Sequence, residues 1–209
     1  MLYSHIAIEG NIGSGKTTLA TMLSNDIDAR LVLEQFADNP FLPKFYADPE
    51  KHAFPLELFF MAERYHQLKN LKEQDLFKPQ IVSDYFFVKS KLFAQNNLKK
   101  DEMQLFNRLF DIMLSSLSNP DLLVYLYSDV ERLQQNIKNR GRDFEQNISD
   151  EYLQNIQDKY LDFLRKQSDF PVLLIDVTNV DFVADKNIYD KIDELIFVEY
   201  SVGVTNEAL

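Results

Sequence analysis

A glycine-rich segment near the start of the chain has the residue types of a phosphate-binding loop. Residues 10–17 read Gly-Asn-Ile-Gly-Ser-Gly-Lys-Thr and fit the pattern G-x-x-x-x-G-K-[ST]. In such a loop the glycines let backbone N–H groups surround an anion, the lysine reaches the terminal phosphates and the hydroxyl binds Mg²⁺. We therefore predict that ATP and Mg²⁺ bind here, with Thr17 as a metal ligand and with nucleotide contacts from Asn11, Gly13, Ser14, Gly15, Lys16, Thr17 and Thr18.

The surroundings of this loop argue against a glycine-rich turn with an unrelated lysine, which is the structural alternative. Residues 3–9 are largely apolar, as in a buried strand, and apolar residues recur at helical spacing over 17–27, so the loop joins a strand to a helix. A dinucleotide-binding loop needs the G-x-G-x-x-G spacing, which differs from the spacing here.

Phosphoryl transfer needs two further groups: one that accepts the proton of the attacking hydroxyl, and cations that hold charge on the transferring phosphoryl. Glu34 ends a short predicted strand, and because strand ends line the ligand crevice of an open α/β sheet, Glu34 is the candidate base. A solvated carboxylate is the alternative. Arg140 and Arg142 flank Gly141, which indicates a mobile lid that closes on phosphates, whereas Lys138 is interpreted as part of a solvated helix end.

A carboxylate also follows the third predicted strand. Asp84 comes directly after the apolar residues 79–83 and resembles a Walker B carboxylate. Because a carboxylate close to a phosphate is unfavourable unless a cation intervenes, we predict that Asp84 binds Mg²⁺, directly or through water, or pairs with Lys89 or Arg142. An Asp84 that turns away into solvent is the alternative.

The elements that must position these residues alternate along the chain. Strand-like apolar runs occur at 3–9, 31–34, 79–83, 122–127 and 172–176, and helical patterns separate them, among them 17–27, 54–71, 86–95 and 101–117. Residues 38–49, with three prolines and several aromatics, are predicted to form a loop. This alternation predicts an α/β fold with a five-stranded parallel sheet and helices on both faces.

Composition limits the class of protein. The chain has 209 residues, of which 45% are hydrophobic and 26% charged, so we predict one globular domain over 1–200 and a frayed tail over 201–209. A formal net charge of −11 disfavours non-specific binding to nucleic acid or to an anionic membrane. Cysteine is absent, the three histidines lack metal-ligand spacing, and no signal peptide or membrane-spanning run is seen, so we expect a cytoplasmic protein.

The predicted helix at 101–117 is apolar on two sides. One stripe has Met103, Phe106, Phe110, Met113 and Leu117, and a second has Leu105, Leu109 and Ile112. Such a helix lies either at the centre of the domain or at a subunit interface.

Together these motifs resemble those of the deoxynucleoside kinase family, ATP-dependent enzymes that phosphorylate the 5′-hydroxyl of deoxynucleosides. The resemblance covers most of the chain and rests on residues 10–18, Glu34, 46–49, 62–64, 93–94, 140–146 and 181–182, which match family positions in order. It implies a P-loop kinase fold with a small arginine-bearing lid, and a homodimer formed through a helix bundle that includes 101–117.

The resemblance also implies roles for individual residues. It assigns Glu34 as general base, Lys16, Arg140, Arg142 and Mg²⁺ as stabilisers of the transferring phosphoryl, Tyr46 and Glu145 as ligands of the sugar 3′-hydroxyl, Arg64 and Phe93 as neighbours of the base, and Asp181 and Phe182 as neighbours of the ATP adenine.

Three positions depart from the family pattern. Residues 83–85 are Ser-Asp-Tyr where the family has an acidic residue, Arg and Ser, so an arginine that normally faces the phosphates is missing. Glu57 stands where the base-reading helix usually carries Gln, and Asn136 replaces an arginine before the lid. These changes resemble a bacterial branch in which such a domain is sometimes fused to a folate-pathway pyrophosphokinase.

Glu57 should alter the base preference. An ionised carboxylate only accepts hydrogen bonds, whereas Gln both donates and accepts, so amino-bearing adenine and cytosine should be preferred over thymine. Arg64 lies seven residues along the same helical face, and its pairing with Glu57 is the alternative.

We therefore expect a deoxynucleoside kinase that serves nucleoside salvage. A nucleoside monophosphate kinase would need more basic residues near Arg64 for the acceptor phosphate. A nucleotide-binding regulatory or interaction module without turnover is favoured by the missing arginines but opposed by the presence of Glu34, Arg140 and Arg142.

Overall fold

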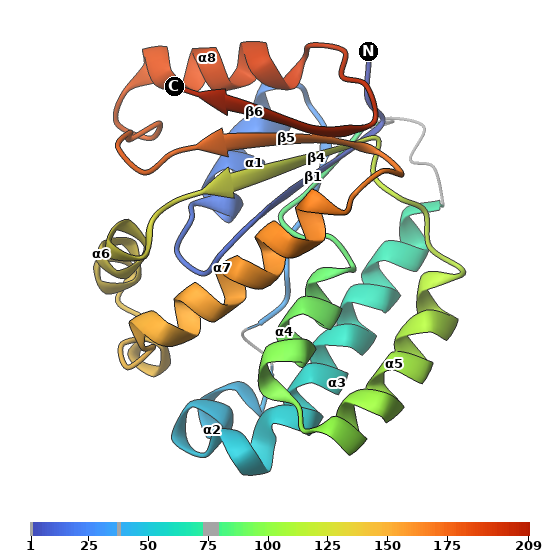
Figure 1. The fold of residues 1–209 in the computed structure, drawn as a ribbon. Coiled ribbons are helices and arrows are strands. Elements are labelled where there is room, and N and C mark those ends of the chain that lie inside the picture. The colour runs from blue at the N-terminus through green and yellow to red at the C-terminus, as the bar shows by residue number, and fades with distance from the viewer. Residues whose placement is uncertain (1, 37–38, 73–79) are drawn as a thin grey trace.

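Parallel strands form one sheet with helices packed on both of its faces (Figure 1). A computed structural model describes residues 2–36, 39–72 and 80–209. The elements in chain order are β1 (His5–Gly10), α1 (Lys16–Asp26), β2 (Arg30–Val32), α2 (Leu42–Ala47), α3 (Pro49–Lys69), η1 (Asn70–Lys72), β3 (Ile81–Ser83), α4 (Lys89–Asn97), α5 (Lys100–Leu114), β4 (Leu122–Tyr127), α6 (Val130–Arg140), η2 (Asp143–Glu145), α7 (Asp150–Arg165), β5 (Pro171–Asp176), α8 (Lys186–Ile196) and β6 (Gly203–Ala208).

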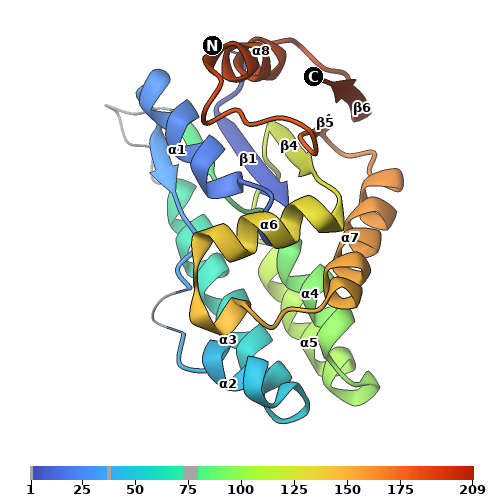
Figure 2. The same ribbon diagram turned by 90° about the vertical axis from the view of Figure 1, so that its left-hand side faces the viewer.

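The strand order brings the segments with chemical groups together. The sheet runs β2-β3-β1-β4-β5-β6 and every neighbouring pair is parallel. Since β3 lies between β2 and β1, the residues that follow these three strands meet at one edge of the sheet. Helix α6 lies across this edge, between α1 and the helices α2 and α3 (Figure 2).

Successive side chains of β1 pack into different cores, as the two-residue period of a strand requires. Ile6 and Ile8 pack with residues of α1 and α8 on one face. Ala7 packs on the other face, in a core that includes Phe106 and Phe110 of α5 and residues of α3, α4 and α7. Both faces of β1 are therefore buried, which accounts for its nearly continuous apolar sequence.

The α/β class and the parallel sheet are confirmed, but the sheet has six strands rather than the predicted five. The sixth is β6, so the expectation of a frayed tail over 201–209 was wrong. Its sequence, GVTNEA, is largely polar and half-exposed. An edge strand forms backbone hydrogen bonds on one side only, and β6 forms them with β5 from Pro171 to Asp176. Such a strand does not require a regular pattern of apolar side chains.

The prediction of a loop over 38–49 was also wrong in its second half, where α2 forms and α3 begins. Two of its prolines, Pro43 and Pro49, stand in the first turn of these helices, where the missing N–H group has no intrahelical partner to lose. Asp48 caps α3 by accepting a hydrogen bond from the backbone N–H of Lys51 at 3.4 Å. Asp38 of this predicted loop, and Pro79 of the predicted third strand, lie outside the described residues.

Of the two apolar stripes predicted on the helix at 101–117, one is buried within the chain. Phe106 and Phe110 of α5 are almost completely inaccessible, whereas Leu105 is 49% and Ile112 70% exposed. None of the helices in the described part of the chain has the length and apolar content needed to cross a membrane.

Candidate active site

The loop between β1 and α1 holds two glycines in the left-handed region. Gly13 has a φ of 86° and Gly15 a φ of 90°. A Cβ on Gly13 would lie 2.8 Å from the carbonyl oxygen of Leu133, and one on Gly15 would lie 2.9 Å from Cζ of Phe182. Both positions therefore require glycine, because the tight loop packs closely against its neighbours.

Lys16 begins α1 and directs its ammonium group back to the loop, where Nζ donates to the carbonyl oxygen of Asn11 at 2.8 Å. Burial and the charge of Lys89 lower the pKa of Lys16 to about 8, although Glu9 and Glu34 oppose this shift. An anion beside Lys16 would raise that pKa again, so the loop is electrostatically suited to receive a phosphate.

Asp84 links the ends of the first three strands. Its Oδ2 accepts from Thr17 Oγ1 at 2.5 Å, and its Oδ1 accepts from the backbone N–H of Glu34 at 2.7 Å. Asp84 is 4% exposed and does not turn into solvent. The predicted pairing of Asp84 with Lys89 or Arg142 is not formed, because Lys89 binds Glu34 and Arg142 binds Glu145. A hydroxyl and a carboxylate beside a phosphate loop are oxygen donors of the kind that Mg²⁺ combines with phosphate oxygens, so Thr17 and Asp84 fit that metal.

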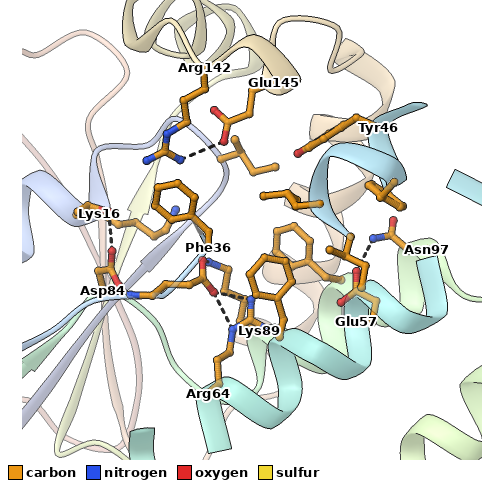
Figure 3. A pocket seen from close by; sticks show the side chains of 18 of the residues that line it. Lys16, Phe36, Tyr46, Glu57, Arg64, Asp84, Lys89, Asn97, Arg142 and Glu145 are labelled. Carbon is orange, nitrogen blue, oxygen red and sulfur yellow. Dashed lines mark hydrogen bonds and ion pairs between the residues drawn. The ribbon is translucent and has the colours of Figure 1, made fainter. Parts of the chain in front are cut away.

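Glu34 follows β2 and is held by two cations, Arg64 and Lys89, both of which are labelled in Figure 3. Arg64 Nη2 lies 2.5 Å from Oε1 and Lys89 Nζ lies 2.7 Å from Oε2. Burial by itself raises the pKa of Glu34, but Arg64 and Lys89 outweigh it and hold that pKa well below its ordinary value. Glu34 is therefore ionised, and both of its carboxylate oxygens are held in place by a cation.

Arg64 thus contacts the candidate base rather than Glu57. Besides Glu34 it donates to Ser90 Oγ at 2.8 Å, and its guanidinium carbon lies 5.0 Å from the centre of the Phe60 ring. The alternative pairing of Arg64 with Glu57 is not formed, because the guanidinium is directed to Glu34.

Sequence reasoning considered Lys89 as a partner of Asp84 and missed its contact with Glu34. The signal for a buried role was a lysine that directly follows the apolar run Phe86, Phe87 and Val88.

Glu57 lies deeper in the same cavity, on α3, and is 2% exposed. Its Oε1 accepts from Asn97 Nδ2 at 2.7 Å, whereas Oε2 is buried and has no hydrogen-bond partner among the described residues. Burial raises the pKa of Glu57 to about 7, and Asn97 and Arg64 limit that rise. Asn97, which sequence reasoning also missed, further donates to the hydroxyl of Tyr152 at 3.2 Å.

The other predicted substrate ligands, Tyr46, Phe93 and Glu145, line this cavity too. Glu145 of η2 is 6% exposed and pairs with Arg140 and, at 3.2 Å, with Arg142. Arg142 also lies over the Phe36 ring, 3.8 Å from its centre. Both lid arginines are therefore bound to Glu145, an acidic residue of the lid itself.

A second cavity lies on the other side of the phosphate-binding loop. It is lined by Gly13, Ser14, Gly15, Lys16, Thr17 and Thr18 together with Asn136, Arg140, Arg142, Asp181 and Phe182, among others. Asn136 Nδ2 donates to the carbonyl oxygen of Gly13 at 2.8 Å and so ties α6 to the loop. Asn11, by contrast, is turned away from this cavity, and its side-chain amide donates to the carbonyl oxygen of Leu153.

The two cavities share four lining residues, Lys16, Thr17, Arg140 and Arg142. One cavity contains Glu34 and the aromatic and acidic residues around Glu57, and the other contains the rest of the loop. Two ligands could therefore meet at the lysine and the arginines, which is the arrangement that a two-substrate transfer of a charged group requires.

Comparison with known proteins gives matches that cover most of the chain. The deoxynucleoside kinase family model matches residues 6–199. A deoxyguanosine kinase of Bacillus subtilis (strain 168) is 34% identical over 192 residues, which cover 90% of this chain and 93% of that protein. A deoxyadenosine/deoxycytidine kinase of the same organism is 28% identical over 92% of this chain and 91% of its own. The fold is similar to that of a deoxyadenosine kinase from M. mycoides, solved with dCMP and dCDP, with a TM-score of 0.79, 24% identity and coverage of 91% of this chain and 99% of that chain.

Proposed function

The chain belongs to the deoxynucleoside kinase family, and on this basis we propose that it transfers the γ-phosphoryl group of ATP to the 5′-hydroxyl of a deoxynucleoside, in nucleoside salvage. The observation that supports this most strongly is the pair of cavities that meet at Lys16, Thr17, Arg140 and Arg142. In this proposal ATP occupies the loop cavity and the deoxynucleoside occupies the cavity that contains Glu34 and Glu57.

The phosphates of ATP bind to the loop from Gly13 to Thr18, with Lys16 on the terminal phosphates, and the adenine lies near Asp181 and Phe182. Thr17 and Asp84, joined at 2.5 Å, would hold Mg²⁺. When bound, Mg²⁺ neutralises charge on the phosphate oxygens. Arg140 and Arg142 exchange Glu145 for the transferring phosphoryl when the lid closes, since a guanidinium binds phosphate oxygens well.

Glu34 acts as general base. The deoxynucleoside 5′-hydroxyl donates to a lone pair of the Glu34 carboxylate that Arg64 and Lys89 leave open, because each carboxylate oxygen can accept two hydrogen bonds. As the 5′-oxygen attacks the γ-phosphorus, its proton passes to Glu34 and the bond to the β,γ-bridging oxygen breaks, which releases ADP. The low pKa of Glu34 keeps the acceptor ionised throughout the neutral pH range.

The rest of the cavity binds the sugar and the base. Tyr46 and Glu145 bind the 3′-hydroxyl, and Phe93 stacks on the nucleobase. Arg64 orients Glu34 next to the nucleobase. In the proposed complex, Oε2 of Glu57, which has no hydrogen-bond partner among the described residues, lies next to the edge of the nucleobase. When ionised it accepts a hydrogen bond from an amino group, so deoxyadenosine and deoxycytidine should be better substrates than thymidine.

We also propose that the chain is one kinase domain and that two copies associate through a helix bundle that includes α5. The exposed Leu105 and Ile112 of α5 support this association, because they present apolar surface next to each other on one helix face.

Steady-state assays of ATP with each of the four common deoxynucleosides test the proposed function. We expect 5′-monophosphate products, with a higher kcat/KM for deoxyadenosine or deoxycytidine than for thymidine. Lys16→Ala should lower the rate on the order of 10²–10³-fold, because one positioned electrostatic donor is lost. Absence of product with every deoxynucleoside would contradict the proposal and favour a nucleotide-binding module, and a preference for deoxynucleoside monophosphates would favour the monophosphate kinase.

A further inference from the structure

Lys89 is a buried cation beside the reacting groups. It is the first residue of α4 and is 6% exposed. Its Nζ lies 2.7 Å from Glu34 Oε2 and 5.7 Å from the centre of the Phe93 ring. It therefore joins the candidate base to a wall of the substrate cavity, without being part of the loop or the lid.

The position of Lys89 is explained by more than its pairing with Glu34. Arg64 already neutralises Glu34 through Oε1 at 2.5 Å. A second buried cation is costly to desolvate, and Lys89 also opposes the charge of Lys16, since it is the largest charge effect that lowers the pKa of Lys16. Lys16 and Lys89 both line the cavity that contains Glu34. The buried Glu9 attracts both lysines, and a phosphoryl group bound beside them would stabilise them further.

The distances place a transferring phosphoryl within reach of Lys89. A general base lies about 2.6–3.2 Å from the hydroxyl oxygen whose proton it takes, and a near-attack geometry puts that oxygen about 3–3.5 Å from the phosphorus. Lys89 Nζ is itself 2.7 Å from the base, so its flexible stem has only a short distance to cover. Asp84 at the end of β3 does not compete for Lys89, because its carboxylate is committed to Thr17 and the backbone of Glu34.

We propose that Lys89 is a catalytic residue that stabilises the transferring phosphoryl from the acceptor side, with a positive charge supplied from the start of α4. This inference rests on the proposed kinase function. During the step, the bond from the 5′-oxygen to the γ-phosphorus forms, the bond to the β,γ-bridging oxygen breaks, and the hydroxyl proton moves to Glu34. Once Glu34 is neutral, the Lys89 ammonium, which keeps its own protons, shifts its hydrogen bond from Glu34 to a phosphoryl oxygen.

The first experiment separates binding from rate. Lys89→Met removes the charge and keeps the length of the side chain, and it should lower kcat by about 10²–10³-fold, the effect of one lost electrostatic donor, while the KM values for ATP and deoxynucleoside change little. Lys89→Arg should recover at least about tenfold of that loss, because the charge is restored. Lys91→Met is the matched control: Lys91 lies on the same helix, also over an aromatic ring, and lines a different groove, so its kcat should stay at the wild-type value.

The second experiment asks whether Lys89 acts directly or through Glu34. In single turnovers, adding Lys89→Met to Glu34→Gln should slow product formation further, because the phosphoryl contact does not depend on the base. If the lysine substitution has no effect in the Glu34→Gln background, Lys89 acts through Glu34 alone and the inference is wrong. Circular dichroism and thermal unfolding check folding, and Lys89→Gln replaces the methionine variant if the latter does not fold.

Two further outcomes distinguish this inference from the proposed function. A wild-type enzyme that phosphorylates deoxynucleosides, with a Lys89→Met variant of equal kcat or with a change confined to KM, overturns the role of Lys89 and leaves the kinase assignment standing. A wild-type protein that phosphorylates none of them overturns both.

Discussion

Glu34 and Glu57 line the same cavity, yet their neighbours give them opposite ionisation behaviour. Glu34 is contacted by Arg64 and Lys89, so its pKa lies far below the ordinary value. Glu57 is contacted by the neutral amide of Asn97, so burial dominates and raises its pKa to about 7. One carboxylate is therefore held ionised at neutral pH, and the other changes its hydrogen-bonding character near neutral pH.

The raised pKa of Glu57 makes a prediction for stability. The folded protein holds this proton more tightly than the unfolded chain, so wild-type stability relative to Glu57→Gln should fall as pH rises from the ordinary pKa of Glu to about 7. We expect the wild type to lose roughly 2–3 kcal/mol more than the variant between about pH 5 and pH 8, from about 1.4 kcal/mol for each unit of pKa shift. Urea unfolding of both proteins at the two pH values measures this, and an equal change in both would show that Glu57 does not titrate in this range.

Asp84 makes a prediction for metal dependence. If Asp84 and Thr17 hold Mg²⁺, Asp84→Asn should raise the Mg²⁺ concentration needed for half-maximal activity, because an amide binds the cation less strongly than a carboxylate, and the deoxynucleoside KM should change little. Asp162→Asn, at an exposed aspartate of α7, is the control. A faster enzyme after Asp84→Asn would mean that Asp84 merely repels phosphate, and an unchanged rate with an unchanged Mg²⁺ titration would place it outside the site.

The residues found from sequence are those whose chemistry depends on local spacing. The loop around Lys16 and Thr17 is contiguous, and Asp84 follows a recognisable strand. The contact between Arg64 and Glu34 joins residues that are 30 positions apart in the sequence. Glu34 lies shortly after β2 and Arg64 lies on α3, so the contact depends on how α3 packs against the sheet. Sequence periodicity gives the face of a helix and does not give its rotation relative to a distant strand. Arg64 was therefore expected beside the nucleobase of the substrate or beside Glu57.

The same limit applies to the secondary-structure elements. The interior strand β4 is apolar throughout and was predicted with its observed bounds, whereas β6 lies at the edge and carries little pattern. Helix α2 was missed because it is short and contains a proline and two aromatic residues, which have low helix propensity. Tertiary contacts, such as the packing of Phe45 against Tyr152, stabilise it instead.

Helix α5 makes a prediction for association. If its outer stripe forms the subunit contact, the wild type should be a dimer in light scattering and Leu105→Asp with Ile112→Asp should be a monomer with unchanged circular dichroism, because buried charges disfavour the contact. Val198→Asp changes a similarly exposed apolar residue elsewhere, at 48% exposure, and should leave the dimer intact. A double variant that remains dimeric would show that α5 is not at the interface.

The molecule combines an acidic overall charge with a cationic centre. The net charge is −11, yet the cavity at the carboxyl edge of the sheet is lined by five cations, Lys16, Arg64, Lys89, Arg140 and Arg142, beside the four carboxylates Glu34, Glu57, Asp84 and Glu145. The strand order produces this concentration, because β1, β2 and β3 are neighbours and their following segments supply the loop, Glu34 and Asp84 to one place. These cations offer a polyanion such as a nucleoside triphosphate local attraction within a chain of negative net charge.

Glu34→Gln gives the most direct test of phosphoryl transfer in this cavity. The amide keeps the shape of the carboxylate but cannot accept the proton, so the variant should bind ATP and deoxynucleoside with nearly wild-type affinity and form 5′-monophosphate in a single turnover about 10²–10⁴-fold more slowly. Binding measured by calorimetry and product measured by rapid quench separate the two effects. A single-turnover rate equal to that of the wild type would contradict the role of Glu34 and with it the assignment of this cavity as the place where the 5′-hydroxyl is activated.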